Sequence, residues 1–374
     1  MKFTVNSTDL LSRLQIVSRV IAPKSTLPIL EDVLFDIADG KLTLTASDLD
    51  TTLVTTMDLP SADADIKVAI SSKMLLETVR EFSDQPLEFN INDNNFAIII
   101  KTASGSYNLV GQNGAEYPAL PSFDDNANNI VFPVETLYEA ISKTIFATTD
   151  DDLRPVMNGV NFDITENNVT TVATDAHKLV RFTTSEVKGS ADSSFILAKK
   201  SANPLLTVLQ KESGSVVVKY DSKNLQFSLD NYNMYCRQVE GRYPNYNGVI
   251  PQNNPRKIIV DRQAFIGALK RVSIFANEAS NLIKLHILPN EIQVSAQDLD
   301  FSVSAEEKLQ CQYDGDEMSI GFKSSFLVEI LKNIDSDDIL MELADASRAG
   351  IILPLKNKEN EDLLMLLMPM LLNE

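Results

Sequence analysis

The side chains that could do chemistry in this sequence are mainly carboxylates and two histidines. His177 follows Asp175 at a spacing that places both side chains on one face of a strand, as an acid–base pair would need. However, neither a Ser or Cys nucleophile motif nor a phosphate-binding glycine loop accompanies them. His286 lies far along the chain from His177, and two cysteines are too few for a Cys-rich zinc site. The pattern therefore favours a hydrogen-bonded or binding role for His177 over catalysis.

Two acidic runs could in principle hold a metal ion. The run at 124–129, with Glu135 after it, nearly matches a calcium loop, but Asn129 stands where the pattern needs glycine and two prolines upstream oppose an entering helix. The run Asp150–Asp152 could serve a two-metal hydrolase, yet adjacent carboxylates point in different directions. We predict a solvated linker and an acidic loop, with no metal and no cofactor, and keep a metal-dependent hydrolase as the rival hypothesis.

The composition is that of an ordinary soluble globular protein with two or three domains. The 374 residues are 44% hydrophobic and 23% charged, which is enough apolar material for packed cores. The longest apolar run, 363–372, is too short for a membrane-spanning helix, and the N-terminus lacks the apolar core of a signal peptide. The low cysteine content suits a reducing compartment. We therefore expect a cytoplasmic protein without membrane contact, which argues against a third hypothesis, an exported adhesion repeat.

One local pattern occurs three times along the chain. An alternating, strand-like run leads into Ala-(Ser/Thr/Gln)-Asp, with the aspartates at Asp48, Asp175 and Asp298, and a second strand-like run follows each. Amphipathic helical periodicity precedes and follows every copy. The helices are expected within 7–24, 71–82, 135–146, 198–211, 261–275 and 322–334.

The helix starts and the polar junctions define the predicted organisation. Asn6 or Ser7 should cap the first helix and Asp261 the fifth. Pro204 lies early in the fourth helix and should fall in its first turn, where proline is tolerated. Two helices and many strands in each copy predict an α+β fold of three similar domains. The predicted domains are residues 1–122, 128–250 and 256–374.

Charge is divided unevenly between these helices and the rest of the chain. The sequence has 33 Lys and Arg against 52 Asp and Glu, a net charge of −19. Inside the six helical segments, however, basic residues outnumber acidic ones. If the helices share one face, that face attracts a polyanion while the remaining surface repels it. The alternative is that Lys and Arg occur there because they favour helices.

Several short motifs follow one another along the whole chain. They are Met1-Lys2-Phe3-Thr4-Val5, Thr26-Leu27-Pro28-Ile29-Leu30, Asn158-Gly159, Ala173-Thr174-Asp175-Ala176-His177-Lys178-Leu179, Gly241-Arg242-Tyr243-Pro244-Asn245-Tyr246 and Met368-Pro369-Met370. In this order, and together with the threefold repeat, the sequence resembles the bacterial β sliding clamps, the processivity subunits of the replicative DNA polymerase.

The resemblance implies a head-to-tail homodimer in which two chains close a ring of six domains, with helices lining the hole and strands outside. Such a ring would encircle double-stranded DNA without reading its sequence, and it would be no enzyme. It would tether the replicative DNA polymerase. The clamp loader and other clamp-binding repair and replication proteins would dock through a hydrophobic peptide groove.

The resemblance also assigns three sets of residues. The DNA-binding set is Lys24, Lys73, Arg80, Lys199 and Lys200. The partner-peptide groove is Met157, Thr174, Ala176, His177, Lys178, Leu179, Pro244, Val249, Leu366, Met368, Pro369 and Met370. The dimer interface is Tyr107 and Leu109 facing Ile274 and Phe275. The Met and Leu side chains of the groove could repack around different apolar peptides.

Some of these positions depart from the family pattern or allow another interpretation. Asp150–Asp152 stand where the family has polar or aromatic residues, which argues against DNA contact by this loop. Ala176 replaces a usual glycine, and Gly248 and Leu371 stand where arginine can occur, so we expect a less cationic groove rim. Met368–Met370 could instead form a plain C-terminal core strand, and the dimer set could instead be internal core.

Overall fold

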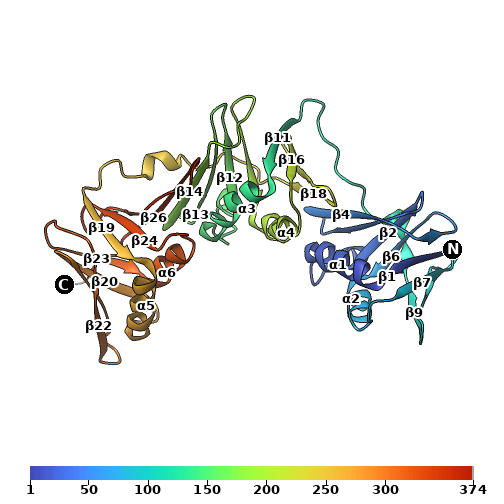
Figure 1. The fold of residues 1–374 in the computed structure, drawn as a ribbon, viewed down its shortest axis with the longest axis horizontal. Coiled ribbons are helices and arrows are strands. Elements are labelled where there is room, and N and C mark those ends of the chain that lie inside the picture. The colour runs from blue at the N-terminus through green and yellow to red at the C-terminus, as the bar shows by residue number, and fades with distance from the viewer. Residues whose placement is uncertain (373–374) are drawn as a thin grey trace. The chain divides into compact units, whose positions relative to one another are not determined.

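The computed structural model describes residues 1–372 and has the expected α+β fold (Figure 1). The last two positions of the predicted third domain, Asn373 and Glu374, lie outside the described residues. The chain forms two compact parts, unit 1 (Met1–Tyr138 with Leu197–Val239) and unit 2 (Glu139–Ile196 with the chain from Glu240). One α-helix lies at each expected helical segment, and only α3 begins outside it, one residue early: α1 (Ser7–Val17), α2 (Ser72–Arg80), α3 (Val134–Ser142), α4 (Lys199–Leu209), α5 (Arg262–Val272) and α6 (Ser324–Lys332).

Unit 1 contains a larger and a smaller antiparallel sheet. The larger has the strand order β10 (Gln112–Asn113), β6 (Ile66–Ser71), β2 (Asp32–Ala38), β3 (Lys41–Ser47), β4 (Thr51–Asp58), β18 (Tyr232–Arg237), β17 (Asn224–Ser228), β16 (Ser215–Tyr220), β11 (Asn128–Pro133). The smaller has the order β5 (Ser61–Ala62), β1 (Lys2–Asn6), β7 (Pro86–Ile91), β8 (Ala97–Lys101), β9 (Ser106–Val110).

Unit 2 also contains a larger and a smaller sheet. The larger has the order β15 (Ser193–Ala198), β12 (Gly159–Ile164), β13 (Val169–Thr174), β14 (Lys178–Thr184), β26 (Glu361–Leu367), β25 (Gly350–Pro354), β24 (Asp338–Leu343), β19 (Arg256–Asp261). The smaller has the order β22 (Val303–Gln310), β21 (Glu291–Asp298), β20 (Leu282–Leu288), β23 (Met318–Lys323).

Each larger sheet joins strands from two neighbouring sequence repeats. In unit 1, β4 pairs with β18, and in unit 2, β14 pairs with β26. A strand pair of this kind holds the repeats together by backbone hydrogen bonds and not only by a linker. The predicted borders of the three domains therefore stay predictions, since the sheets continue from one repeat into the next.

The apolar face of the larger sheet in unit 1 is covered by helices. Leu53 on β4 and Met234 on β18 are direct cross-strand partners without exposed surface, so the apolar face continues across the joint. α1 packs on β3 and β4, α2 on β2 and β6, and α4 on β18. Leu10 and Leu14 of α1 are fully buried, and burial of each such side chain stabilises the packing by about 1.5–3 kcal/mol.

Two of the expected helix features are confirmed and one is wrong. The side chain of Asn6 caps α1 by accepting the N–H groups of the second and third residues after it, at 2.8 and 3.3 Å. Asp261 caps α5 through the N–H of Ala264 at 2.6 Å. Pro204, in contrast, lies beyond the first turn, because α4 already begins at Lys199. Its ring is buried, and that burial offsets part of the cost of the lost backbone hydrogen bond.

The aspartate of the threefold repeat has a structural role. Asp48, Asp175 and Asp298 each stand at the turn between two paired strands. In every case Oδ1 accepts the N–H groups of the second and third residues after the aspartate, at 2.7 to 3.4 Å. The repeat thus marks a side-chain-stabilised turn, which explains why one residue type recurs there.

None of the helices in the described part of the chain combines the length and the apolar character that crossing a lipid bilayer requires.

An ion-pair network within unit 2 ties α3 to the segment around β26. Lys143 Nζ lies 2.9 Å from Glu139 Oε2 and 3.0 Å from Glu361 Oε2, and Lys358 pairs with the other oxygen of Glu139. Burial opposes ionisation of Glu139, but the hydrogen bonds from Lys358 and Lys143 outweigh it and lower the pKa of Glu139 from 4.5 to about 2. The pKa of Glu361 is raised, because this half-buried carboxyl is partly removed from water and faces Glu139.

Glu139→Gln should lower the free energy of unfolding at pH 7, and the loss should shrink at acid pH. A folded-state pKa below the unfolded value contributes stability that is present above pH 4.5 and lost as the pH falls toward about 2. Urea denaturation of both proteins between pH 7 and pH 2.5 measures this, because the range spans the loss below pH 4.5. Glu135→Gln, on the exposed side of α3, is the matched control and should change little. If the difference in free energy of unfolding between the two proteins stayed constant over this pH range, the lowered pKa of Glu139 would be contradicted.

Candidate functional site

The apolar positions of the expected peptide groove lie on the face of the larger unit 2 sheet that points away from α6. Leu179 on β14 and Leu366 on β26 are direct cross-strand partners, with 2% and 3% of their surfaces exposed. Lys178, one residue earlier, points the other way, with Nζ 3.1 Å from Glu329 Oε2 on α6. Because successive side chains of a strand point to opposite faces, Leu179 and Leu366 share the face opposite α6.

A buried apolar cluster occupies this face and is partly covered by the segment 243–250. Tyr243 and Tyr246 of that segment pack against the cluster. The hydroxyl of Tyr246 donates to Asp163 Oδ2 at 2.7 Å, and burial together with this carboxylate raises the pKa of Tyr246. Besides Leu179 and Leu366, the cluster contains Val172, Ile250, Ala349, Ile351 and Leu364.

The C-terminal segment borders the same region and keeps apolar side chains exposed. The N–H of Met368 donates to the carbonyl of His177 at 2.8 Å, and the N–H of Met370 donates to the carbonyl of Gly321 at 2.8 Å. Met368 is 42% exposed and Val249 is 59% exposed. Since β26 ends just before Met368, the alternative of a plain core strand is wrong for that residue.

The side chain of Lys178 lies away from the apolar face and forms an ion pair with Asp175. Lys178 is buried, with Nζ 2.9 Å from Asp175 Oδ2 and 4.4 Å from the ring centroid of Phe326. Asp175 thus bonds this ammonium group as well as the backbone of its own turn. Its carboxylate is fully engaged, so the acid–base pair with His177 is not supported. Lys178 helps to fix the turn and does not line the face that Leu179 contributes to.

The remaining groove positions fall around this turn and its neighbours. The hydroxyl of Thr174 donates to the carbonyl of Lys178 at 2.8 Å and accepts the N–H of Ala176 at 3.1 Å. Ala176 and His177 are exposed at the tip of the turn. The other expected positions are half-buried: Met157, Pro244, Pro369 and Met370.

Phe326 on α6 is a neighbour of these residues that sequence reasoning missed. Its ring lies 6.1 Å from the ring of His177 and 4.6 Å from Lys323 Nζ, in addition to its contact with Lys178. The sequence did offer one signal for Phe326: it is an aromatic residue outside the buried apolar stripe of an amphipathic helix. In the structure Phe326 is only half-buried, whereas its neighbour Leu327 is buried.

Ala176→Gly should stabilise the protein by up to about 1 kcal/mol, because Ala176 has φ +75°, a conformation that costs a residue with a side chain about that much.

The opposite substitution, from glycine to alanine, can be made at Gly214. It has φ +84°, and a Cβ placed on it would meet no other atom within 4 Å, so Gly214→Ala should destabilise by a similar amount through the backbone alone. Denaturant midpoints of the three proteins measure both. A lower midpoint for Ala176→Gly would contradict the expected strain.

The five expected DNA-binding cations all belong to unit 1. Lys73 and Arg80 are exposed on α2, where a separation of seven residues places them on the same side of the helix. Lys199 and Lys200 form the start of α4, and Lys24 is exposed in the loop after α1. Four of the five therefore stand on helices. The expectation that the first helical segment reaches Lys24 is wrong, because α1 ends at Val17 and the 3-10 turn after it ends at Val20.

Lys200 differs from an isolated surface lysine. It pairs with the buried carboxylate of Asp48, and its Nζ lies 3.9 Å from Asp50 Oδ2, although 62% of the side chain is exposed. A hydroxyl–hydroxyl contact of 2.8 Å between Thr51 and Ser201 fastens the same turn to α4. The two carboxylates partly neutralise Lys200, so its contribution to anion binding is weaker than that of a free lysine.

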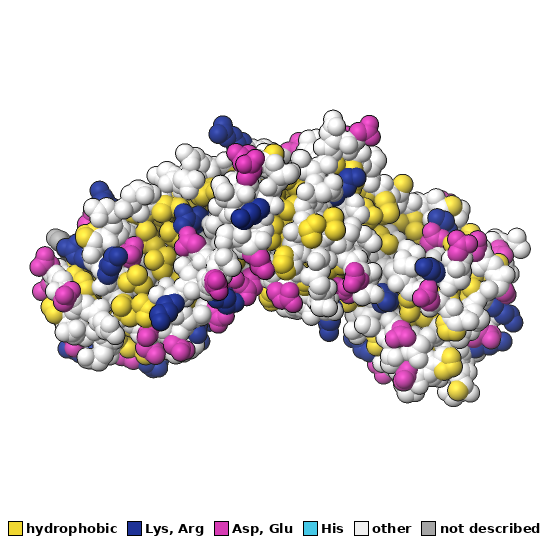
Figure 2. Space-filling model, turned by 45° about the horizontal axis from the view of Figure 1, so that its top comes forward, with side chains coloured by type: hydrophobic (Ala, Val, Ile, Leu, Met, Phe, Trp, Pro, Cys, Tyr) yellow, Lys and Arg dark blue, Asp and Glu magenta, His cyan; other side chains and the backbone are white. Residues whose placement is uncertain are grey.

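Figure 2 shows one face of the space-filling structure, on which acidic and basic side chains are interspersed among apolar ones. On the face in view, the described residues form no continuous basic surface. This agrees with an acidic chain whose cations are concentrated on particular helices.

Three of the four expected dimer residues are exposed. Tyr107 lies on β9, an edge strand of the smaller sheet in unit 1, and is 39% exposed with its ring edge-on to Phe82 at 5.0 Å. Leu109 on the same strand is half-buried. In unit 2, Ile274 and Phe275 lie in the 3-10 turn that follows α5 and are 77% and 38% exposed. The alternative of core burial is therefore wrong for Tyr107, Ile274 and Phe275.

The two acidic runs are engaged in local structure. Asp151 accepts the N–H of Leu153 at 2.9 Å and pairs with Arg154 Nε at 2.9 Å, which lowers the pKa of Asp151. In the other run, the N–H of Asp124 donates to Asp221. Among residues 1–372, no group of three or more His, Cys, Asp or Glu side chains is arranged to hold a metal ion.

Comparison with protein families gives three consecutive matches. Residues 1–121 match the family model for the N-terminal domain of the DNA polymerase III beta subunit, residues 131–245 match its central domain and residues 247–371 match its C-terminal domain. Among curated relatives, the beta sliding clamp of Haemophilus influenzae is 27% identical, and the match covers 99% of this chain and 100% of that protein. The beta sliding clamp of Bacillus subtilis is 25% identical, with 99% of each chain covered.

Solved structures agree with these matches. A sliding clamp from Bartonella birtlesii, bound to griselimycin, is 27% identical with a TM-score of 0.92, and both chains are covered completely. A sliding clamp from Pseudomonas aeruginosa, also bound to griselimycin, has a TM-score of 0.94 over both full chains at 23% identity, which supports the fold.

Proposed function

The chain belongs to the DNA polymerase III beta subunit family, the β sliding clamps. From this premise we propose that two copies close a ring around double-stranded DNA. We also propose that the ring binds client proteins in an apolar groove. It is a DNA sliding clamp, a non-catalytic processivity subunit and not an enzyme. The observation that carries the proposal is the match to the family over three consecutive domains. We assign these domains to residues 1–122, 128–250 and 256–374 and expect the protein to work in the cytoplasm.

Encirclement makes tight binding to DNA unnecessary. A closed ring cannot leave a duplex sideways, and base contacts would create positions at which it stops. Lys24, Lys73, Arg80, Lys199 and Lys200 would face the phosphates. The pairing of Lys200 with Asp48 and Asp50 suits this task, since it reduces the attraction to any single phosphate without removing the positive charge.

The groove would hold short peptides from the replicative DNA polymerase, the clamp loader and repair proteins. Buried Leu179 and Leu366 form an apolar floor, and Met368 and Val249 leave exposed apolar surface beside it. An apolar peptide side chain placed there would remove this surface from water. Thioether side chains such as Met368 adapt to differing partners, which suits one site that serves several clients.

Retention on circular DNA tests the proposed ring. The full-length protein is loaded by the clamp loader onto nicked circular DNA, isolated with it, and then released by linearising the DNA with a restriction enzyme. We expect the protein to remain on the circle and to leave the linear form from its free ends. Retention on linear DNA without blocked ends would contradict encirclement, as would rapid loss from the intact circle.

A further inference from the structure

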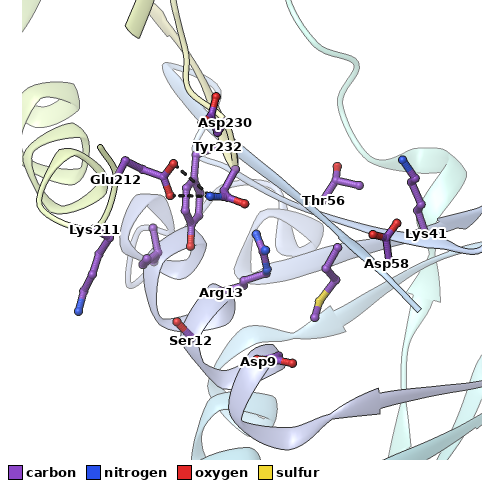
Figure 3. Close-up of a pocket in the computed structure, with 13 residues that line it drawn as sticks. Asp9, Ser12, Arg13, Lys41, Thr56, Asp58, Lys211, Glu212, Asp230 and Tyr232 are labelled. Atoms are coloured by element: carbon purple, nitrogen blue, oxygen red, sulfur yellow. Dashed lines mark hydrogen bonds between the residues drawn. The ribbon is translucent and has the colours of Figure 1, made fainter. Parts of the chain in front are cut away.

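A polar cavity in unit 1 has no part in the proposed function. It has a volume of about 690 Å³ and lies between α1, the paired ends of β3 and β4, and the turns that precede β16 and β18 (Figure 3). This volume is within the usual range for small-ligand sites, about 300–1,000 Å³. The cavity is also located beside the β4–β18 joint, where two sequence repeats meet. Such junctions are common positions for binding sites.

Arg13 of α1 supplies a half-buried cation at this cavity. One guanidinium nitrogen donates to the hydroxyl of Thr55, and Cζ lies 5.9 Å from the ring centroid of Tyr232. Among residues 1–372, Arg13 has no carboxylate within ion-pair distance, although Asp9 stands one helical turn before it. A guanidinium that is held in place on an aromatic ring but lacks a counter-ion is suited to receive a carboxylate.

The remaining charges around the cavity are of both signs and lie nearer solvent. Asp9, Asp58 and Asp230 are exposed carboxylates. Lys41, opposite Asp58 in the β3–β4 pair, and Lys211 are exposed cations. Glu212 is already bonded, since its two oxygens accept from the side-chain amide of Asn231 at 3.1 and 3.2 Å. Figure 3 shows Arg13 among these carboxylates. The acidic groups would repel a polyanion but attract a ligand that also carries a positive charge.

We propose that this cavity binds a ligand with both a carboxylate and an ammonium group. The carboxylate pairs with Arg13, and the ammonium group lies near Asp9, Asp58 and Asp230. Two sources share this chemistry: a free amino acid, and a segment of a partner protein with neighbouring acidic and basic side chains. The site is separate from the groove residues, all of which belong to unit 2. The inference therefore does not depend on the proposed client binding.

Nuclear magnetic resonance of the full-length protein tests the assignment through the side-chain Nε–Hε signal of Arg13. The probes are glycine and acetyl-Glu-Lys-amide, which carry both charges, and acetate and methylammonium, which carry one each. We expect both doubly charged probes to shift the Arg13 signal in a saturable way and each single ion to bind about tenfold more weakly, because it lacks one charge-assisted contact. Tighter binding of the peptide supports a partner segment, and tighter binding of glycine supports a free amino acid.

Arg13→Gln should weaken binding of glycine and of the peptide by about tenfold, measured by calorimetry. Arg19→Gln is the matched control, because Arg19 is exposed just after α1 and outside the cavity. Four results would overturn the proposal: no shift of the Arg13 signal with any probe, equal binding of acetate and glycine, unchanged binding by Arg13→Gln, or displacement of glycine by a short DNA duplex, which would assign Arg13 to phosphate contact.

Discussion

Met368→Asp is expected to weaken binding of polymerase-derived peptides by at least about 100-fold, because a carboxylate next to an apolar peptide side chain loses hydration without gaining a partner. Met368 is 42% exposed, and its N–H is fixed to the carbonyl of His177. The substituted side chain therefore points into the same region as the native one. Fluorescence anisotropy with a labelled peptide from the polymerase measures the affinity.

The control for this change is Val217→Asp. Val217 on β16 is 41% exposed, so the same charge is introduced at the same accessibility but in unit 1. It should leave peptide affinity unchanged, and neither variant should alter the dimer. Deletion of Met368–Glu374, which extends into residues outside the described part of the chain, should abolish peptide binding in the same way. Full peptide affinity in Met368→Asp would show that the groove has been misplaced.

Ile274→Asp is expected to convert the dimer to monomers at micromolar concentration and to abolish retention on circular DNA. Ile274 is 77% exposed, so the monomer has no packing to lose and should stay folded. In the proposed dimer the new carboxylate would be buried against Tyr107 and Leu109 on the uncharged edge strand β9, where no cation on that strand can pair with it. Sedimentation velocity measures the mass.

Leu153→Asp is the matched control for the dimer prediction, because Leu153 is 91% exposed in the acidic loop and has no assigned contact with a second copy. Tyr107→Asp, on the other proposed side of the interface, should reproduce the effect of Ile274→Asp. A mass that remains that of two chains in both variants would assign the contact to other residues. If either variant lost retention on circular DNA but kept the mass of two chains, these residues would be needed for closing the ring and not for dimerisation.

The sequence predicted what depends on local periodicity. All six helices were expected because apolar residues recur every three or four positions, and the caps Asn6 and Asp261 follow from side chains that accept backbone N–H groups. The repeated aspartates could be found as a pattern, and their role became clear from the hydrogen bonds of Asp48, Asp175 and Asp298. The position of Pro204 was not predicted in this way. This proline lies inside α4, where burial of its ring outweighs the local preference against proline.

Contacts between distant segments could not be predicted in this way. Lys178 was expected in the groove, but a strand turns each residue to the opposite face from the next, and the register of β14 directs this lysine to Glu329 on α6. Pairing of Lys200 with Asp48 links positions far apart in the sequence. The resemblance assigned candidate residues by position, and their exposure and partners depend on side-chain packing that no local pattern encodes.

The β4–β18 joint has a consequence for a chain that has been cut. A protease nick in the polar junction 122–128 breaks the covalent link, yet the fragments still share the backbone pairs of β4 with β18 and the buried contact of Leu53 with Met234. The two pieces should copurify under native conditions and come apart only in denaturant. A first repeat produced alone would present β4 as a bare edge and should be prone to self-association.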